Sequence, residues 1–256
     1  IVEANNTKNE YIKIIYANKE ILYVPLSSIN KITSYHKKNI ETKSVLDSLS
    51  STKWKIKKNK ALKRSADHAA EILDIEARRQ KSLSSSLKID DTSLSEFNDD
   101  FPFDETNDQL IAFESIRKDM QLIKPMNRVL CGDVGFGKTE VAMRAAYTSV
   151  FSNKQVVIVC PSTILCDQHF NSFLKRFNNF PVNIKKLSRH NSLKNKNEII
   201  SKYNMNEIDI LITTHIIFNN NIDFKNTGLL IVDEEHKFGI KQKNYIKDKQ
   251  TNIHIL

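Results

Sequence analysis

The chain has 256 residues, of which 40% are hydrophobic, so it is long enough to form one large domain or two smaller ones. No apolar run approaches the roughly 18 residues of a membrane span, and the N-terminus lacks the features of a secretory signal peptide. The net charge of +9 is weak evidence for nucleic-acid binding, because the excess is mostly Lys, a bias that an AT-rich genome produces through its codons. The three cysteines show no metal-ligand or redox spacing, so we expect free thiols and a cytoplasmic protein.

Residues 1–35 are predicted to contain strands. The runs Tyr11–Tyr16 and Glu20–Pro25 flank Ala17–Lys19, which has the length of a hairpin connection. Because two strands alone are only marginally stable, we expect these residues to be part of a small β module. Residues 36–52 are rich in Ser and Lys, which indicates a linker.

One long helix is predicted from Trp54 to about Ser84. Its apolar residues recur at three- and four-residue spacing, at Leu62, Ala66, Ala69, Leu73 and Ala77. Residues 84–100 contain many Ser and Asp and are expected to break this helix. Linker and helix together make a predicted segment over residues 36–100.

From Phe101 onward the pattern alternates between strands and helices, which predicts an α/β lobe with a parallel sheet over residues 101–256. Strands are expected at 127–131, 155–160, 182–187, 208–213 and 229–233. Helices are expected at 107–123, 138–151, 164–177 and 193–203. Cys131 and Cys160 end two of these strands and are expected to be buried thiols.

A phosphate-binding loop is predicted where three of the five glycines fall within one short run. The run fits the pattern G-x-x-x-x-G-K-[ST] and comprises Gly132, Asp133, Val134, Gly135, Phe136, Gly137, Lys138 and Thr139. Glycine permits the backbone to form a nest of amides at a helix N-terminus, where a phosphate binds. Lys138 is expected to reach the β and γ phosphates of ATP, and Thr139 to bind Mg²⁺. The alternative is a chance glycine turn, against which the flanking strand and helix argue.

An acidic element follows a second apolar run. Leu229–Val232 reads as a buried parallel strand and leads into Asp233, Glu234, Glu235 and His236. Ligands bind at the carboxyl ends of such strands, so Asp233 is placed to hold Mg²⁺ opposite Thr139. Glu234 is placed to orient or deprotonate the attacking water, as phosphoryl transfer requires. The alternative is a solvated acidic turn.

These two blocks, Cys131–Ala146 and Asp233–Gly239, closely resemble the superfamily-2 helicase motifs of the bacterial transcription-repair coupling factor (Mfd) family. Residues 11–35 are similar to the end of that family's Tudor-like, RNA-polymerase-interacting module, and Trp54–Lys81 is similar to its inter-domain helix. The resemblance implies three segments: a partial Tudor-like module at 1–35, the linker and long helix at 36–100, and the first RecA-like lobe, truncated, at 101–256.

The resemblance also implies an adenine-reading motif in the segment Phe101–Gln109. Gln109 is expected to read the adenine edge through its amide, with Phe103 near the base. A helix-surface amide is the alternative for Gln109.

Contacts to DNA are implied by three further motifs. Pro161–His169 resembles a motif that contacts the DNA backbone and retains Thr163 and Gln168, but Cys166 and Asp167 depart from the usual Ala and Gln. An added carboxylate at Asp167 would weaken DNA binding if it faced the strand.

The remaining residues that the resemblance assigns to DNA are Ser188, Arg189, Thr214 and His215. Thr213 stands where the family usually has Gly. His236 is expected to couple the hydrolytic site to DNA. Ordinary surface or strand-end polarity is the alternative for Arg189 and His215, and a satisfied histidine beside an acidic turn is the alternative for His236.

The resemblance implies an ATP-dependent double-stranded DNA translocase that displaces RNA polymerase stalled at lesions and recruits excision-repair proteins. The family's Thr-Ala-Thr-Pro segment and second RecA-like lobe do not follow Leu256, and the first residue is not Met, so we expect a fragment that hydrolyses ATP slowly or not at all. Two alternatives stay open: a RecG-like fork helicase, and a non-hydrolysing remnant or interaction fragment.

Overall fold

The computed structural model describes residues 2–4, 7–33, 46–49, 51–133, 135–219, 222–239, 242, 245 and 252–256. The chain divides into two compact units, residues 1–70 and 71–256. No described helix combines the length and the apolar character that a membrane span requires. Most of the predicted linker, and Val134 of the predicted phosphate loop, lie outside the described residues.

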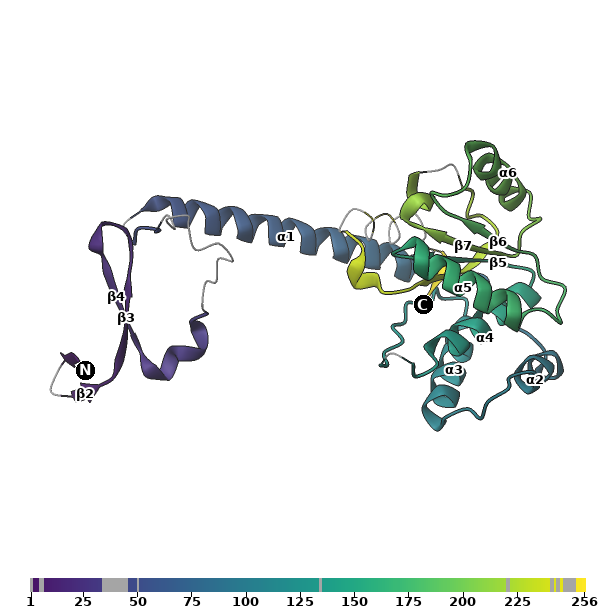
Figure 1. Cartoon of the computed structure of the whole chain (residues 1–256), viewed down its shortest axis with the longest axis horizontal. Coiled ribbons are helices and arrows are strands. Elements are labelled where there is room, and N and C mark those ends of the chain that lie inside the picture. The colour runs from purple at the N-terminus through teal and green to yellow at the C-terminus, as the bar shows by residue number, and fades with distance from the viewer. Residues whose placement is uncertain are drawn as a thin grey trace. The chain divides into compact units, whose positions relative to one another are not determined.

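The first unit contains two antiparallel strand pairs (Figure 1). Strand β1 (Val2–Ala4) pairs with β2 (Thr7–Asn9), and β3 (Tyr11–Ile15) pairs with β4 (Ile21–Pro25). The predicted hairpin is therefore present, and its turn Ala17–Lys19 places Asn18 at φ 57° and Lys19 at φ 59°. A short 3-10 helix, η2 (Leu26–Lys31), follows β4. The pair β1–β2 was not predicted, since three-residue strands carry too little alternation to be read from sequence.

The long helix α1 (Thr52–Lys81) is confirmed, with its end three residues before the predicted one. Its buried residues are Ile75 and Arg79, whereas Leu62 and Leu73 of the predicted apolar stripe are exposed. The predicted break over residues 84–100 was incomplete, because it contains α2 (Asp91–Asp99). The Asp90 carboxylate caps that helix by accepting from the Ser93 amide at 2.9 Å, and its buried face is Leu94 and Phe97.

The second unit holds a five-stranded, entirely parallel sheet in the order β6-β7-β5-β8-β9. Its strands are β5 (Gln155–Cys160), β6 (Ile184–Leu187), β7 (Ile210–Thr214), β8 (Thr227–Val232) and β9 (His254–Ile255). Its further helices are α3 (Asn107–Met120), α4 (Lys138–Phe151), α5 (Thr163–Arg176) and α6 (Leu193–Asn204). Short 3-10 helices follow β7 and β8 at η3 (His215–Asn219) and η4 (Glu235–Lys237). This is the predicted α/β fold with a RecA-like parallel sheet.

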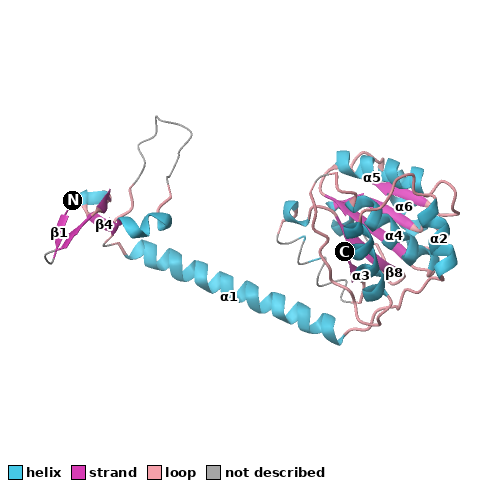
Figure 2. Ribbon diagram, turned by 90° about the horizontal axis from the view of Figure 1, so that it is seen from below, coloured by secondary structure: helices cyan, strands magenta, loops and turns pink. Residues whose placement is uncertain are grey.

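Side chains of the central strands alternate between two cores, so the sheet is buried on both faces. Figure 2 shows the helices packed around the strands of this sheet. Val156 and Ile158 of β5 join the core formed with α2–α5, whereas Val157 and Val159 join the core formed with α6 and the segments after β7 and β8. Buried parallel strands are continuous apolar runs for this reason.

The strand expected at 127–131 was wrong in extent. Only Asn127 makes a parallel bridge, to Ile255 of β9, with the Arg128 amide donating to the Ile255 carbonyl at 3.1 Å. The chain then leaves the sheet, and Cys131 is exposed rather than buried. Cys160 and Cys166 are buried free thiols.

Candidate nucleotide and DNA site

The predicted phosphate loop lies between the sheet edge at Asn127 and helix α4. Gly135 and Gly137 have φ values of 86° and 73°, in the left-handed region that favours glycine, and Gly137 is the N-cap of α4. Lys138 is the first residue of α4, and its Nζ donates to the carbonyls of Gly132 at 2.5 Å and Asp133 at 2.7 Å. The ammonium group therefore lies within the loop, beside the helix N-terminus where an anion is favoured.

Gln109 is brought onto this loop by the start of α3. Its Oε1 accepts from the Thr106 amide at 2.9 Å, which forms a capping box with the Thr106 hydroxyl. Its Nε2 donates to the Phe136 carbonyl at 3.0 Å. One amide hydrogen and one lone pair on Oε1 remain for a ligand, and that pair matches the N7 and N6 groups of adenine.

Phe103 lies on the same segment and is 71% exposed. Its ring meets Phe101 edge to face, with centroids 5.6 Å apart. An exposed aromatic ring can stack on a base, and Phe103 lies three residues before Thr106 in the sequence. The role of Phe103 stays a prediction.

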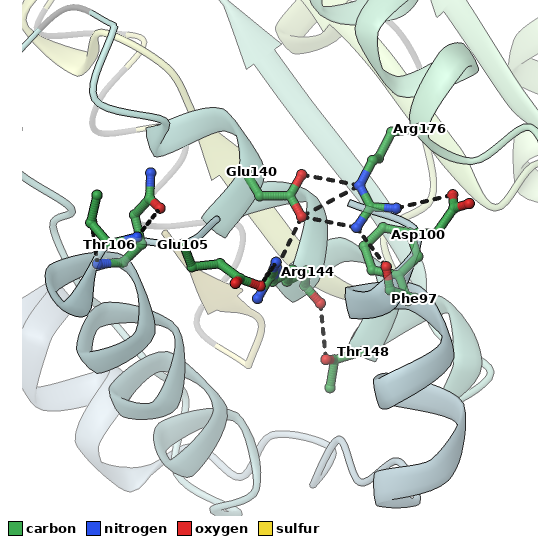
Figure 3. Close-up of polar contacts among 9 residues, drawn as sticks. Phe97, Asp100, Glu105, Thr106, Glu140, Arg144, Thr148 and Arg176 are labelled. Atoms are coloured by element: carbon green, nitrogen blue, oxygen red, sulfur yellow. Dashed lines mark hydrogen bonds and ion pairs between the residues drawn. The ribbon is translucent and has the colours of Figure 1, made fainter. Parts of the chain in front are cut away.

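A largely buried charge network links the predicted adenine-reading segment, Phe101–Gln109, to helices α4 and α5 (Figure 3). Glu140 of α4 accepts from Arg144 Nε at 2.9 Å and from Arg176 Nη2 at 3.0 Å. Arg144 Nη2 also donates to Glu105 at 2.6 Å, which lowers the pKa of the Glu105 carboxyl. Arg176, the last residue of α5, also donates from Nη2 to the Phe97 carbonyl at 2.6 Å.

Asp233 follows β8 at the carboxyl edge of the sheet, and its amide donates to the Val159 carbonyl on β5 at 3.0 Å. Its Oδ2 accepts from His169 Nε2 at 2.9 Å, and because a carboxylate only accepts, Nε2 carries the proton. This hydrogen bond, supported by the nearby charge of Lys138, holds the pKa of Asp233 below its ordinary value, against the effect of burial.

Glu234 has a left-handed backbone, with φ 50° and ψ 51°, and its carboxylate forms an ion pair with Lys237. A non-glycine residue in this region costs of order 1–3 kcal/mol and is commonly found at functional sites. His236 is exposed on η4. The structure thus places Asp233, Glu234 and His236 at one strand end, whereas their roles in hydrolysis and coupling stay predictions.

The predicted DNA-contacting residues follow the carboxyl ends of neighbouring strands β5, β6 and β7. Thr163 begins α5 and Gln168 is exposed, as are Arg189 and His215. Ser188 and Thr214 are instead buried, at 1% and 3% exposure, so their side chains are not presented to a ligand. The Ser188 hydroxyl and amide both donate to Asn191 Oδ1, which shapes the turn that carries Arg189.

The three departures from the family pattern, Cys166, Asp167 and Thr213, are accommodated locally, and Cys166 is a buried thiol. Asp167 pairs with Lys186 of β6 at 2.5 Å, so its added negative charge is balanced within the protein. Thr213 is fully buried, and its hydroxyl donates to the Thr214 carbonyl at 3.2 Å.

Magnesium fits this donor set only together with a nucleotide. Among the described residues, no group of three or more His, Cys, Asp and Glu side chains could hold a metal ion. Mg²⁺ is commonly held by one or two protein oxygens plus substrate phosphates and water. The hydroxyl of Thr139 and the carboxylate of Asp233 are oxygen donors of the required kind.

The chain belongs to the DEAD/DEAH box helicase family, which its sequence matches over residues 106–254. Over its whole length it is similar to the transcription-repair-coupling factors of Haemophilus influenzae (41% identical over 255 residues) and Escherichia coli (42% identical over 255 residues). The chain spans 22% of the length of each of these two relatives. The predicted resemblance to the coupling factors is therefore confirmed.

A solved structure of RecG bound to a three-way DNA junction has the same lobe. It matches 72% of this chain and 24% of its own length, with a TM-score of 0.64 and 34% sequence identity. This likeness confirms the RecA-like fold of the α/β unit.

His169, Glu140 and Arg176 were not predicted from the sequence as parts of the site. Glu140 follows the phosphate-loop motif directly and His169 follows Gln168, so both lie inside motifs that had been read for other residues. Their partners are 36 and 64 residues away in sequence, and no local pattern connects them.

Proposed function

We propose that this chain supplies the ATP-binding lobe of an ATP-driven double-stranded DNA translocase that acts on RNA polymerase stalled at lesions. The observation that supports the proposal is that the predicted phosphate loop lies near Asp233, since the charge of Lys138 acts on that carboxylate, in a chain similar throughout to transcription-repair-coupling factors. The relatives' similarity includes residues 1–100, beyond the helicase lobe, which favours this function over fork remodelling of the RecG kind.

In this account the nucleotide is held from three sides. Gln109 reads adenine beside Phe103, the loop amides and Lys138 hold the phosphates, and Thr139 and Asp233 hold Mg²⁺. Glu234 orients or deprotonates the attacking water. Mg²⁺ neutralises the charge that develops on the transferred phosphoryl group.

We infer that the 256 residues alone hydrolyse ATP very slowly. An arginine finger contributes on the order of 10³–10⁵ in rate in related phosphoryl transfer, and in this family that residue belongs to a second lobe. Closing and opening of two lobes on DNA is what couples ATP to movement. Excision-repair proteins and RNA polymerase are partners of the intact translocase in this proposal.

A titration with a fluorescent ATP analogue and Mg²⁺ tests the nucleotide site. The wild-type chain is expected to bind saturably, and Lys138→Ala to bind at least about thirtyfold more weakly, since a hydrogen bond to a charged group is worth about 2 kcal/mol. Lys124→Ala, which removes an exposed lysine outside the loop, is the control. Binding that is absent, or indifferent to Lys138, would overturn the proposal.

DNA binding is tested separately by the fluorescence anisotropy of a labelled duplex. Arg189→Ala is expected to weaken DNA binding, because Arg189 is exposed beyond the end of β6. The slope of log affinity against log salt concentration should fall in magnitude by about 1, as for one lost phosphate contact. An unchanged affinity and an unchanged salt slope would remove Arg189 from the DNA surface.

A further inference from the structure

Helix α5 contacts one predicted magnesium ligand, Asp233, and the residue that follows the other, Thr139. At its middle, His169 donates to Asp233 Oδ2 at 2.9 Å, with the two side chains 17% and 29% exposed. At its end, Arg176 pairs at 3.0 Å with Glu140, and both side chains are only 8% exposed. Glu140 directly follows Thr139 in α4. Side chains of one helix therefore contact the two segments that carry Thr139 and Asp233.

The same helix carries predicted DNA contacts on another face. Successive residues of an α-helix point about 100° apart, so Gln168 and His169 face different directions. Gln168 is exposed, whereas His169 is half-buried against Asp233. His169 therefore connects Asp233 to the helix that also carries the predicted DNA contacts.

We propose that His169 is a positioning residue, which holds the Asp233 carboxylate in the orientation that binds the magnesium ion of the nucleotide. The inference rests on the proposed ATP-binding function. Accepting one hydrogen bond from His169 leaves lone pairs on the carboxylate for a metal ion or its water. Hydrogen bonds of this kind orient carboxylate ligands, and their loss typically costs 10–100-fold in metal affinity.

The test compares affinity for a fluorescent ATP analogue in Mg²⁺ with affinity in EDTA. The ratio of the two affinities isolates the metal-dependent part of binding from the general integrity of the site. His169→Leu fills much of the space without a donor, whereas His169→Gln places an amide N–H near the position of Nε2. His68→Leu, on α1 in the other compact unit, is the control for the substitution itself. Far-ultraviolet circular dichroism and melting temperature report whether each variant folds.

We expect His169→Leu to lower the Mg²⁺-dependent gain by roughly tenfold and to leave the EDTA affinity unchanged. His169→Gln should restore most of that gain, and His68→Leu should match wild type. An unchanged gain in His169→Leu, an equal loss in Mg²⁺ and EDTA, or no restoration by His169→Gln would overturn the inference while leaving the ATP site in place. A wild-type chain that binds no nucleotide would overturn the proposed function and the inference together.

Discussion

Gln109 lies so close to Gly137 that a β-carbon on the glycine would come within 2.1 Å of Gln109 Nε2. The amide nitrogen occupies this space because it donates to the carbonyl of Phe136, the residue before Gly137. Gly137 thus leaves room for Gln109, in addition to its left-handed backbone in the predicted phosphate loop. Gly135 differs, since a β-carbon there would meet nothing within 4 Å although its φ of 86° is also left-handed.

The substitution Gly137→Ala should therefore impair nucleotide selectivity in addition to straining the backbone. Both Gly137→Ala and Gly135→Ala place alanine in the left-handed region, at about 1–2 kcal/mol. Only Gly137→Ala displaces Gln109, so only this variant should lose its preference for ATP over GTP in competition titrations. Equal selectivity in the two variants would show that Gln109 does not depend on Gly137.

Substitution of Gln109 itself tests its remaining hydrogen-bonding capacity. Gln109→Ala removes both groups that match adenine. We expect ATP affinity to fall by roughly tenfold, because one bidentate contact is lost, and GTP affinity to change little. The measurement is competition of unlabelled ATP and GTP against a fluorescent analogue. A parallel fall for both nucleotides would assign Gln109 to loop structure alone.

Glu140→Ala should be strongly destabilising. Glu140 bonds two arginines whose side chains are only 3% and 8% exposed, and its removal leaves both buried charges without this partner. Breaking a buried pair in this way costs about 3–5 kcal/mol. Chemical denaturation of Glu140→Ala and of Glu114→Ala, a half-exposed carboxylate on α3, should show this loss only in the first.

The free energy of unfolding should fall in mild acid, because folding keeps the buried His254 ring from taking up a proton. The ring is fully buried, with Nδ1 accepting from the Met126 amide at 3.1 Å and Nε2 donating to the Ser85 carbonyl at 2.9 Å. Burial, with a smaller contribution from nearby Arg79, lowers its pKa below 6.5, against a smaller opposing effect of Asp119 and the Ser85 bond. The unfolded chain then binds the proton more readily, so stability is complete above pH 6.5 and declines as the pH falls below it.

His254→Gln removes this titration. Its melting temperature should therefore change less between pH 7 and pH 5 than that of the wild-type chain. If the two pH profiles run parallel, another group is responsible for the acid sensitivity.

The sequence was sufficient for elements whose signal is local. The helix beginning at Lys138 and the strand Gln155–Cys160 have the predicted bounds, because a glycine cap and a continuous apolar run mark them. Helix α2 was missed because its signal, the Asp90 cap with Leu94 and Phe97, is short and lies in a Ser- and Asp-rich segment. The strand before the phosphate loop is only one bridge long, since the chain leaves the sheet after Asn127.

The candidate site likewise contains residues that could be predicted from the local sequence and residues that could not. The phosphate loop and the run from Asp233 to His236 were read from spacing, because phosphate chemistry requires consecutive residues there. The ion pairs of Glu140 with Arg176 and of Asp233 with His169 depend on how α4, α5 and β8 pack. Only the folded chain brings these residues together.

Amide hydrogen exchange with and without MgATP tests the central claim most directly, because it locates the nucleotide on the chain. If MgATP binds as proposed, exchange should be slower in three segments, 103–109, 132–140 and 232–236, and should change little in α6 (Leu193–Asn204). Lys138→Ala should remove most of the protection at a nucleotide concentration just sufficient to saturate the wild-type chain. Protection confined to other segments, or none at a saturating concentration, would contradict the assignment of this lobe as the ATP site.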